Sequence, residues 1–435
     1  MSRYKIALEP LRGFRDILEP SSRKLKRLAE IFSQIAEAHG YTLVIPPTLE
    51  RFELFAVKSG EEIKQSMFVF KDKAGRQVAL RPEITASATR IYLKHLQGHP
   101  KPIRIYYIAN CFRYEEPQHA RYREFWQAGL ELIGVQGVVG DIEVIKIMLD
   151  FYEKIGMTKK IKIKLGNIAL YRRLFNYYNI NEQFQDHLLH LMDKGLHDKV
   201  LDELTERGYG QLTTKLKELW EIGFEKALEY FKDDNLIYPA LEELKLIYNV
   251  IAKYNPQLSI EIRLDFARGL AYYTGPIFEV TVPGFPVSIA GGGRYDKLIE
   301  VYGGPPTPGT GFAIGLDRTL IAAEELGIEL NLEERQPSKA AIVILAENSK
   351  AVLMALQVQR QLISAGCIAT IYQTTKLSKF IPRLLDQNYR YLITIGSREV
   401  ENNTINFKDL AKREQLEISI DKLSSLIDCS PPIAE

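Results

Sequence analysis

The chain has 435 residues, 46% of them hydrophobic and 26% charged, and its 57 basic and 55 acidic residues leave a formal net charge of only +2. This composition is typical of a globular protein with two or three domains, and since no basic tail for nucleic acid is evident, any RNA contact must use local patches. There is no run of about 18 apolar residues and no signal-peptide pattern, so we expect neither membrane spanning nor secretion. Cys111, Cys367 and Cys429 form no CxxC pair, which argues against a zinc ribbon and a disulfide framework and favours the cytoplasm.

The first predicted element is an amphipathic helix with Ser21 and Ser22 as plausible N-caps and Gly40 at its end. Its apolar stripe consists of Leu25, Leu28, Ala29, Phe32, Ile35 and Ala36. The following YTLVIPPTLE predicts a strand that breaks at Pro46 and Pro47.

Residues 67–85 predict a hairpin that turns at 73–75, followed by a strand that runs into RPE. Glu83 and Thr85 would share a face if the extended conformation persists, so a carboxylate and a hydroxyl would point together. The alternative is that they cap the helix that follows.

Residues 103–134 predict a long antiparallel hairpin with a charged, proline-containing loop. In its second arm the apolar positions are Trp126, Ala128, Leu130 and Leu132, and the alternate positions are Arg123, Phe125, Gln127, Gly129 and Glu131. Since alternate strand side chains face opposite ways, one set can cover a core while the other, with Arg113 and Arg121, lines an open surface. Such a face suits phosphates, a stacked base and a cationic ligand, although a solvated face with ordinary ion pairs is the alternative.

From about residue 161 to 255 the sequence has helical spacing and few strand signals, which predicts a helical insertion rather than part of a sheet. Its basic side chains could contact RNA backbone, and solvated faces are the alternative for each: Lys159, Lys160, Lys162, Lys164, Arg172 and Arg173.

Strand patterns return from Ile260, with PGFP as a turn and Gly291–Gly293 as a close backbone approach before a short helix. A glycine-rich strand then enters an amphipathic helix with Arg318 in its first turn. A cation is disfavoured there, so either an anion lies close by or the arginine reaches away from the helix axis. After the polar linker NLEERQPSK, a βαβαβ pattern and two further strands predict a small α/β domain with a largely parallel sheet.

These stretches together carry a family resemblance. FRYEEPQHARYREFWQ resembles the second signature motif of class II aminoacyl-tRNA synthetases, and RGLAYYTG and RPE followed by Thr are similar to strings of the histidyl-tRNA synthetase family. The resemblance implies an α/β chain whose α+β catalytic core is an antiparallel sheet flanked by helices. It implies a core in two parts (1–160 with motifs 1 and 2, 256–330 with motif 3) around the insertion (161–255), then a linker (331–338) and an anticodon-binding α/β domain (339–435).

The same resemblance implies the ligands of the site residues. For ATP as a substrate it implies contacts from Arg113, Glu115, Arg121, Arg123, Phe125 and Arg318, with Arg113 and Arg268 catalytic at the α-phosphate and Mg²⁺ on the outer phosphates. For L-histidine it implies Glu83, Thr85 and Gln127 at the ammonium and carboxylate ends and Glu131, Tyr272 and Tyr273 around the imidazole. It also implies tRNA(His), with its acceptor end near Gln118, and a homodimer, and it implies no protein-held metal.

The chain departs from the family pattern at Ala271, Trp126, Ala120 and Phe14, where Asp, His, Gly and Thr are common. Trp126 is expected on the core side of its strand. The rival interpretations are a paralogue without catalysis, such as the regulatory subunit of ATP phosphoribosyltransferase, an RNA-sensing module, and an unrelated nucleotide-dependent ligase.

Overall fold

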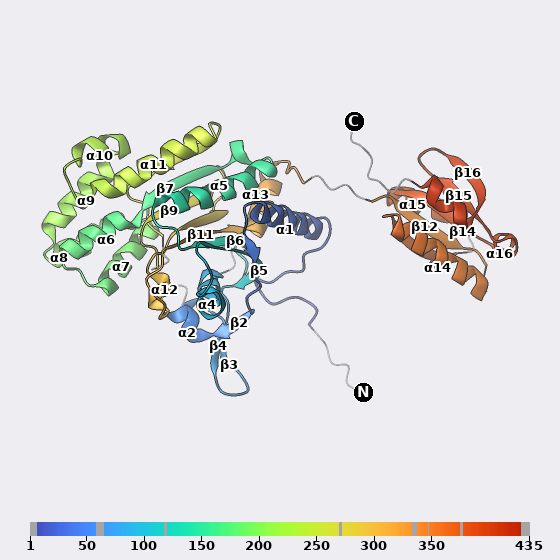
Figure 1. Cartoon of the computed structure of the whole chain (residues 1–435), viewed down its shortest axis with the longest axis horizontal. Coiled ribbons are helices and arrows are strands. Elements are labelled where there is room, and N and C mark those ends of the chain that lie inside the picture. Colours follow the sequence, from blue (N-terminus) through green and yellow to red (C-terminus); the bar gives the residue numbers. More distant parts are fainter. Residues whose placement is uncertain are drawn as a thin grey trace. The chain divides into compact units, whose positions relative to one another are not determined.

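The computed structural model of the chain describes residues 7–57, 65–116, 120–268, 272–332, 337–346, 348–374 and 377–427. They divide into two compact units, Met1–Leu332 and Glu333–Glu435, each considered by itself (Figure 1). Among the described residues, no helix has the length and apolar content needed to cross a bilayer.

The first unit is built on an eight-stranded sheet with the order β1-β5-β6-β11-β10-β9-β7-β8. The strands are β1 (Thr42–Leu43), β5 (Ile103–Phe112), β6 (Glu124–Ile133), β7 (Lys162–Asn167), β8 (Ser259–Ile262), β9 (Pro276–Thr281), β10 (Ala290–Arg294) and β11 (Gly309–Gly315). The pairings from β5 through to β7 are antiparallel, and the edge strands β1 and β8 pair in parallel. The predicted hairpin and antiparallel core are confirmed.

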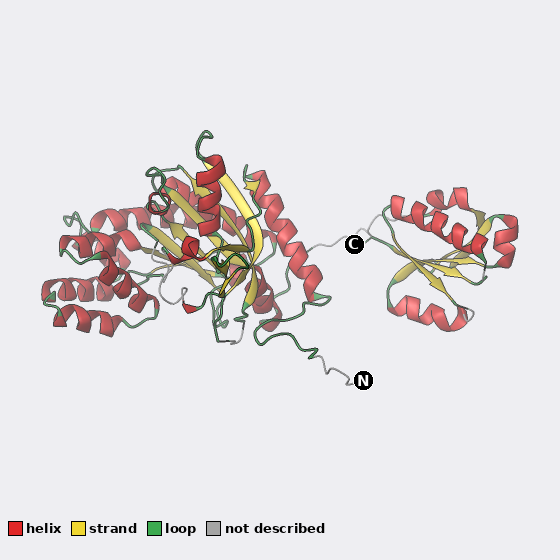
Figure 2. Cartoon of the chain, turned by 90° about the horizontal axis from the view of Figure 1, so that it is seen from below, coloured by secondary structure: helices red, strands yellow, loops and turns green. Residues whose placement is uncertain are grey.

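Helices cover this sheet and bury its apolar positions (Figure 2). They are α1 (Ser21–Ala38), α5 (Val138–Lys154) and α13 (Leu316–Glu325), with the short α12 (Leu298–Val301) and the 3-10 turn η2 (Thr158–Lys160). In β6, Ala128, Leu130 and Leu132 are fully buried in the core that α1 and α5 share, and Trp126 packs against it. The alternation predicted for this arm is therefore correct, and its other face is left for a site.

The segment after α5 contains both a strand and a bundle of helices. The helices are α6 (Ile168–Tyr177), α7 (Glu182–Asp193), α8 (His197–Glu206), α9 (Gly210–Ile222), α10 (Phe224–Tyr230) and α11 (Tyr238–Tyr254), and they gather at the β7 end of the sheet (Figure 1). The prediction of an insertion outside the sheet from residue 161 is wrong at its start, because β7 lies inside the sheet between β9 and β8. Its buried Ile163 and Leu165 alternate with Lys162 and Lys164, which pair with carboxylates of neighbouring strands.

A small three-stranded sheet lies beside the main one, with β2 (Leu49–Arg51), β4 (Gln77–Leu80) and β3 (Val69–Lys71) in that order. Around it lie α2 (Phe52–Ala56), α4 (Thr85–Ile91) and the π-helical turn η1 (Tyr92–Leu96). The predicted hairpin at 73–75 is confirmed as the β3–β4 connection. The predicted N-caps are wrong, because Ser21 is already the first residue of α1 and Pro20 occupies the cap position with no side-chain cap.

The second unit is a five-stranded sheet, β13-β12-β14-β15-β16, with helices on both faces (Figure 2). Its strands are β12 (Lys339–Ile344), β13 (Ile368–Gln373), β14 (Tyr389–Ile395), β15 (Thr404–Asp409) and β16 (Glu414–Ser419), and its helices are α14 (Ser349–Ser364), α15 (Leu377–Asp386), α16 (Ser397–Asn402), η3 (Ile420–Lys422) and α17 (Leu423–Leu426). The α/β prediction is confirmed, but only β13, β12 and β14 are parallel, so the sheet is mixed. Cys367 is disulfide-bonded, which the cysteine spacing did not indicate.

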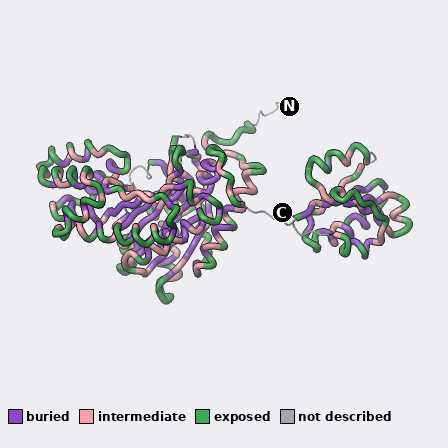
Figure 3. Tube along the Cα trace, turned by 90° about the horizontal axis from the view of Figure 1, so that it is seen from above, coloured by how far each residue is buried: buried purple, intermediate pink, exposed green. Residues whose placement is uncertain are grey.

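Burial is concentrated in the central strands of the two large sheets, such as β5 and β6 in the first unit and β12 and β14 in the second, and Figure 3 shows the buried tracts inside each unit. Charged side chains are rare in such interiors unless they are paired. The buried charged residues of the first unit include Glu83 and Glu131, which lie near each other beneath the open face of β6.

Candidate functional site

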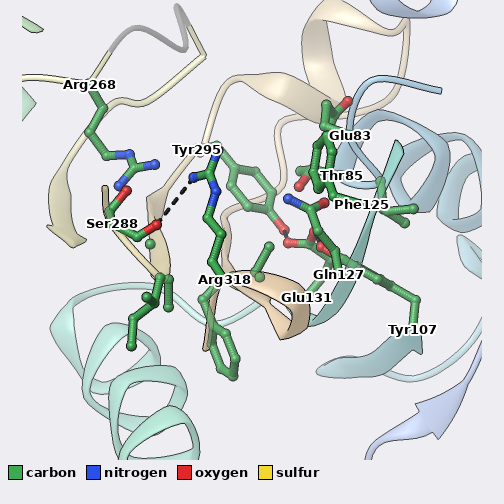
Figure 4. A pocket seen from close by; sticks show the side chains of 18 of the residues that line it. Glu83, Thr85, Tyr107, Phe125, Gln127, Glu131, Arg268, Ser288, Tyr295 and Arg318 are labelled. Atoms are coloured by element: carbon green, nitrogen blue, oxygen red, sulfur yellow. Dashed lines mark hydrogen bonds between the residues drawn. The ribbon is translucent and has the colours of Figure 1, made fainter. Parts of the chain in front are cut away.

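An open pocket with about 760 Å³ of empty space lies on the face of the large sheet opposite α1 and α5 (Figure 4). Ten of the thirteen predicted site residues line it: Glu83, Thr85, Arg113, Phe125, Gln127, Glu131, Arg268, Tyr272, Tyr273 and Arg318. They come from the start of α4 and the residues before it, the residue after β5, β6, the segment before β9 and α13, so the fold gathers side chains that are distant in sequence.

One end of the pocket is built around Glu131, which is buried on β6. The Tyr107 hydroxyl donates to Glu131 Oε1 at 3.3 Å, and the Tyr295 hydroxyl donates to Oε2. Gly311 lies directly opposite Glu131 on β11, and a Cβ there would meet Oε2 at 2.0 Å, so glycine makes room for the carboxylate. Burial raises the pKa of Glu131 to about 8, although hydrogen bonds from Tyr295, Thr85 and Tyr107 oppose the rise.

Tyrosine rings enclose the space next to this carboxylate. The ring centroids of Tyr272 and Tyr273 are 4.9 Å apart, and those of Tyr272 and Tyr295 are 6.0 Å apart with nearly perpendicular planes. A carboxylate with two of its acceptor sites occupied by tyrosines retains others for a ligand N–H. This end can therefore hold a flat ring that bears an N–H group.

Glu83 and Gln127 lie beside that end. The Glu83 carboxylate accepts from the backbone N–H of Ala86 at 3.0 Å, so it caps the first turn of α4 while it also lines the pocket. The extended conformation does not persist, because α4 begins at Thr85, yet Glu83 and Thr85 both line the pocket as predicted. Burial raises the pKa of Glu83. Cys111, a buried thiol whose pKa burial raises to about 12, donates to Gln127 Oε1 at 3.2 Å and leaves the amide NH₂ for a ligand.

The other end of the pocket is cationic, with Arg113, Arg268 and Arg318 along it. Arg113 Nε donates to the Pro82 carbonyl at 2.9 Å, and its guanidinium carbon is 5.4 Å from the centre of the Phe125 ring. Arg318 Nη1 donates to the Ser288 carbonyl at 3.2 Å (Figure 4). Arg318 therefore reaches away from its helix axis, which is one of the two arrangements that its place in α13 allowed.

The pKa of Arg318 is lowered to about 10 by burial and by the neighbouring charges of Arg113, Arg121 and Arg268, with Glu115 opposing them. Cations that disfavour one another's charge in this way are stabilised by an anion placed between them. The arrangement can bind a polyanion such as a phosphate chain.

Three predicted residues do not line the pocket. The Glu115 carboxylate lies 3.8 Å from the guanidinium groups of both Arg113 and Arg121, and the Arg121 side chain is 44% exposed. Glu115 and Arg121 therefore lie at the margin of the pocket. Arg123 is buried elsewhere: Nε donates to the Glu115 carbonyl at 3.1 Å, and the guanidinium carbon lies 3.7 Å from the centre of the Tyr114 ring. The expectation that Arg123 belongs to the open face is wrong.

The departures from the family pattern have different structural consequences. Ala120 has φ +58°, a left-handed conformation that glycine adopts without strain. Phe14 packs edge-to-face on Phe68, and Trp126 is on the core side as expected. Ala271 and Gln118 lie outside the described residues.

Sequence reasoning missed Tyr107, Tyr295, Ser288 and Cys111. Tyr107 and Cys111 fall on the pocket side of β5, so the alternation of that arm could have found them. Tyr295 and Ser288 flank β10 and carried no comparable signal.

Comparisons with known proteins identify the family of the chain. Residues 13–319 match the family described as Histidyl-tRNA synthetase, and residues 339–430 match the one described as Anticodon binding domain. A histidine–tRNA ligase of Sulfurisphaera tokodaii is 42% identical over 426 residues, which cover 96% of this chain and 98% of the relative. One of Metallosphaera sedula is 40% identical over 434 residues, 97% of this chain and 99% of the relative.

Solved structures give the same result at lower identity. The apo S. aureus histidyl-tRNA synthetase is 25% identical with a TM-score of 0.68, covering 97% of this chain and 100% of that one. The chain also resembles a Bacillus halodurans structure described as an ATP phosphoribosyltransferase regulatory subunit/histidyl-tRNA synthetase. That structure is 23% identical with a TM-score of 0.73, covering 90% of this chain and 99% of that one, and at this identity the likeness supports the fold only. From the family match over most of the chain and the near full-length relatives, this chain belongs to the histidyl-tRNA synthetase family.

Proposed function

We propose that this chain is an enzyme that ligates L-histidine to tRNA in two steps. Histidine and ATP first give histidyl-adenylate and pyrophosphate, and the histidyl group then passes to the 3′ end of tRNA(His). The observation that carries the proposal is the difference between the two ends of one pocket. Glu131 lies among tyrosines at one end, and Arg113, Arg268 and Arg318 lie at the other. The near full-length relatives named histidine–tRNA ligase support it.

In the activation step a carboxylate oxygen of histidine attacks the α-phosphorus of ATP. One P–O bond forms, the P–O bond to pyrophosphate breaks, and two anions must be held together meanwhile. Cations and fixed geometry supply most of the acceleration in such reactions, so no protein nucleophile is needed. In our proposal Arg113 and Arg268 contact the α-phosphate and are the catalytic residues.

We assign the rest of ATP to the cationic end of the pocket as well. Arg318 and Arg121 contact the outer phosphates, Phe125 stacks on adenine, and Glu115 helps to read the base. We propose only a structural role for Arg123 beside Tyr114 and Glu115, because its guanidinium stacks on the Tyr114 ring and donates to the Glu115 carbonyl.

We assign histidine to the end of the pocket that contains the buried carboxylates. Glu83, Thr85 and Gln127 hold the ammonium and carboxylate groups, and Glu131 with Tyr273 reads the imidazole while Tyr272 closes the pocket. An amino acid without a ring N–H would leave buried polar groups unpaired, which can give discrimination of roughly 10⁴-fold without an editing site.

We propose that Mg²⁺ enters with ATP. Within the described residues, no group of three or more His, Cys, Asp or Glu side chains could hold a metal ion. Mg²⁺ usually keeps several waters and binds to the phosphates of ATP, so we assign it to the outer phosphates and to no residue of this chain. When bound, the ion would neutralise charge on the outer phosphates.

The remaining partners are proposed from the family. The second unit, which matches the anticodon-binding model, would bind the anticodon of tRNA(His). We also propose a homodimer and a cytoplasmic location, as both fit an enzyme that charges tRNA.

The test is ATP-pyrophosphate exchange with each of the twenty amino acids. Exchange stimulated by histidine alone, followed by charging of tRNA(His) and no other tRNA, is the expected result. Histidine binding without exchange would instead favour a regulatory paralogue of the ATP phosphoribosyltransferase kind, and exchange with no transfer to tRNA would favour a different ligase.

A further inference from the structure

Arg268 lies against residues of three neighbouring strands, of which Gly291 lines the pocket and Glu279 and Lys164 do not. Gly291 on β10 lies opposite Glu279 on β9, and Glu279 lies opposite Lys164 on β7. These three residues therefore form one row across the sheet. The Arg268 side chain, 21% exposed, lies against this row.

Gly291 provides the space for the guanidinium. A Cβ at this position would be 2.1 Å from Arg268 Nη1 and 2.7 Å from its Cζ. Gly291 is not among the glycines with a positive φ, so its backbone does not require glycine. Glycine at this position instead leaves the space that the Arg268 guanidinium occupies.

Glu279 provides the opposing charge. Its Oε1 lies 3.6 Å from Arg268 Nη1, and its Oε2 lies 3.6 Å from Lys164 Nζ. Arg268 Nη1 also donates to the backbone carbonyl of Phe278, the neighbour of Glu279, at 3.4 Å. The carboxylate is thus shared between one cation that lines the pocket and one that does not.

A restraint is needed at this place because the pocket cations repel one another, as the neighbours of Arg318 show. Burial disfavours the charge of Arg268, but the neighbouring Tyr273 and the carboxylates of Glu279 and Asp193 raise its pKa above the ordinary value. Glu279 attracts the guanidinium, and Lys164 limits how far the carboxylate can move.

We infer that Glu279 is a positioning residue for Arg268, which it holds in the space above Gly291 while Lys164 holds Glu279 in turn. This inference rests on the proposed function, since it is there that Arg268 acts on the α-phosphate. Glu279 does not line the pocket, so it acts on the rate of activation and not on histidine binding.

The test is the isosteric Glu279→Gln variant of the full chain, measured by histidine-dependent ATP-pyrophosphate exchange. We expect kcat to fall by about 10- to 10²-fold, the scale for misplacing a reacting group by about 1 Å, with the KM for histidine changed less than about twofold. Glu279→Asp keeps the charge and should restore part of the rate. Glu261→Gln is the matched control, because Glu261 pairs with Lys162 on the same sheet at 2.7 Å and should leave the rate unchanged.

A double-mutant cycle separates positioning from general damage. In an Arg268→Ala background, adding Glu279→Gln should change kcat less than about twofold, because its target is gone. Losses that multiply, a wild-type rate in Glu279→Gln, or an aspartate no better than glutamine would each overturn the inference. Failure of the wild-type protein to exchange with histidine would instead reject the proposed function.

Discussion

The hydroxyl of Tyr295 donates a hydrogen bond to the buried carboxylate of Glu131. In our proposal the Glu131 side chain accepts from the imidazole of histidine, and Glu131→Gln keeps its shape but replaces one acceptor oxygen with an NH₂ donor. A buried donor left facing the imidazole N–H costs about 1–3 kcal/mol, so the KM for histidine should rise by roughly 5- to 10²-fold. Steady-state exchange at varied histidine measures this, with the KM for ATP as the internal control. An unchanged KM for histidine would remove Glu131 from the histidine site.

The pH dependence of stability gives a second prediction for Glu131. Burial raises its pKa from the ordinary 4.5 to about 8, so between these values the folded protein keeps a proton that the unfolded chain releases. The folded state then binds more protons, and this residue's contribution to stability falls as pH rises through that window. Relative to Glu131→Gln, the ligand-free wild-type protein should lose thermal stability between roughly pH 5 and pH 8. Melting curves that shift in parallel would contradict the raised pKa.

Much of the site was predictable because strand alternation is a local property. The two faces of β6 followed from the spacing of Phe125, Gln127 and Glu131 alone. What the sequence could not show is register, since the contact of Tyr295 with Glu131 depends on how β10 and β11 align beside β6. The row formed by Gly291, Glu279 and Lys164 could not be predicted for the same reason, because it depends on the pairing of three strands that no local pattern reveals.

Two errors have specific physical reasons. Arg123 was assigned to the open face by extending the alternation one residue too far. The strand begins at Glu124, and the backbone N–H of Arg123 donates to the Gly13 carbonyl instead. Strand β7 was missed because the whole stretch from residue 161 was interpreted from its helical spacing, although Ile163 and Leu165 have the period of two that marks a half-buried strand.

Arg268→Ala tests the catalytic assignment. Losing one preorganised charge that stabilises a transition state should cut the rate of activation by ~10²–10³. Arg263→Ala is a suitable control, because Arg263 lies close in sequence, pairs with Glu261 and Asp265, and does not line the main pocket. Single-turnover formation of histidyl-adenylate measures both variants. Near-normal activation in Arg268→Ala would exclude the role proposed for it.

Gly291→Ala should reduce activity with little effect on stability. The added methyl group would meet the end of a flexible side chain, Arg268, which can move aside at small cost in folding free energy. The guanidinium would then be misplaced, and activation should fall by about 10²-fold. Gly210→Ala is the control, since a Cβ at that helix position meets nothing within 4 Å. The idea fails if Gly291→Ala retains the wild-type rate.

The last prediction concerns the attachment of the helices to the segment before Arg268. The hydroxyl of Tyr171 on α6 donates to the backbone carbonyl of Leu264 and accepts from Trp220 Nε1 at 3.1 Å. Tyr171 is buried, so Tyr171→Phe leaves both partners without this bond. An unpaired buried polar group costs about 1–3 kcal/mol, and the free energy of unfolding should fall by about that amount.

Urea denaturation followed by tryptophan fluorescence measures this loss for the first unit by itself, because the two tryptophans, Trp126 and Trp220, both lie within Met1–Leu332. The midpoint should fall while the m-value stays constant. Tyr230→Phe is the control, since Tyr230 is 60% exposed and its ring contact with Phe231 does not use the hydroxyl. If both variants unfold at the wild-type midpoint, the Tyr171 hydroxyl does not stabilise the attachment. A loss in Tyr171→Phe alone, together with slower activation, would show that the helices also help to fix the segment that carries Arg268.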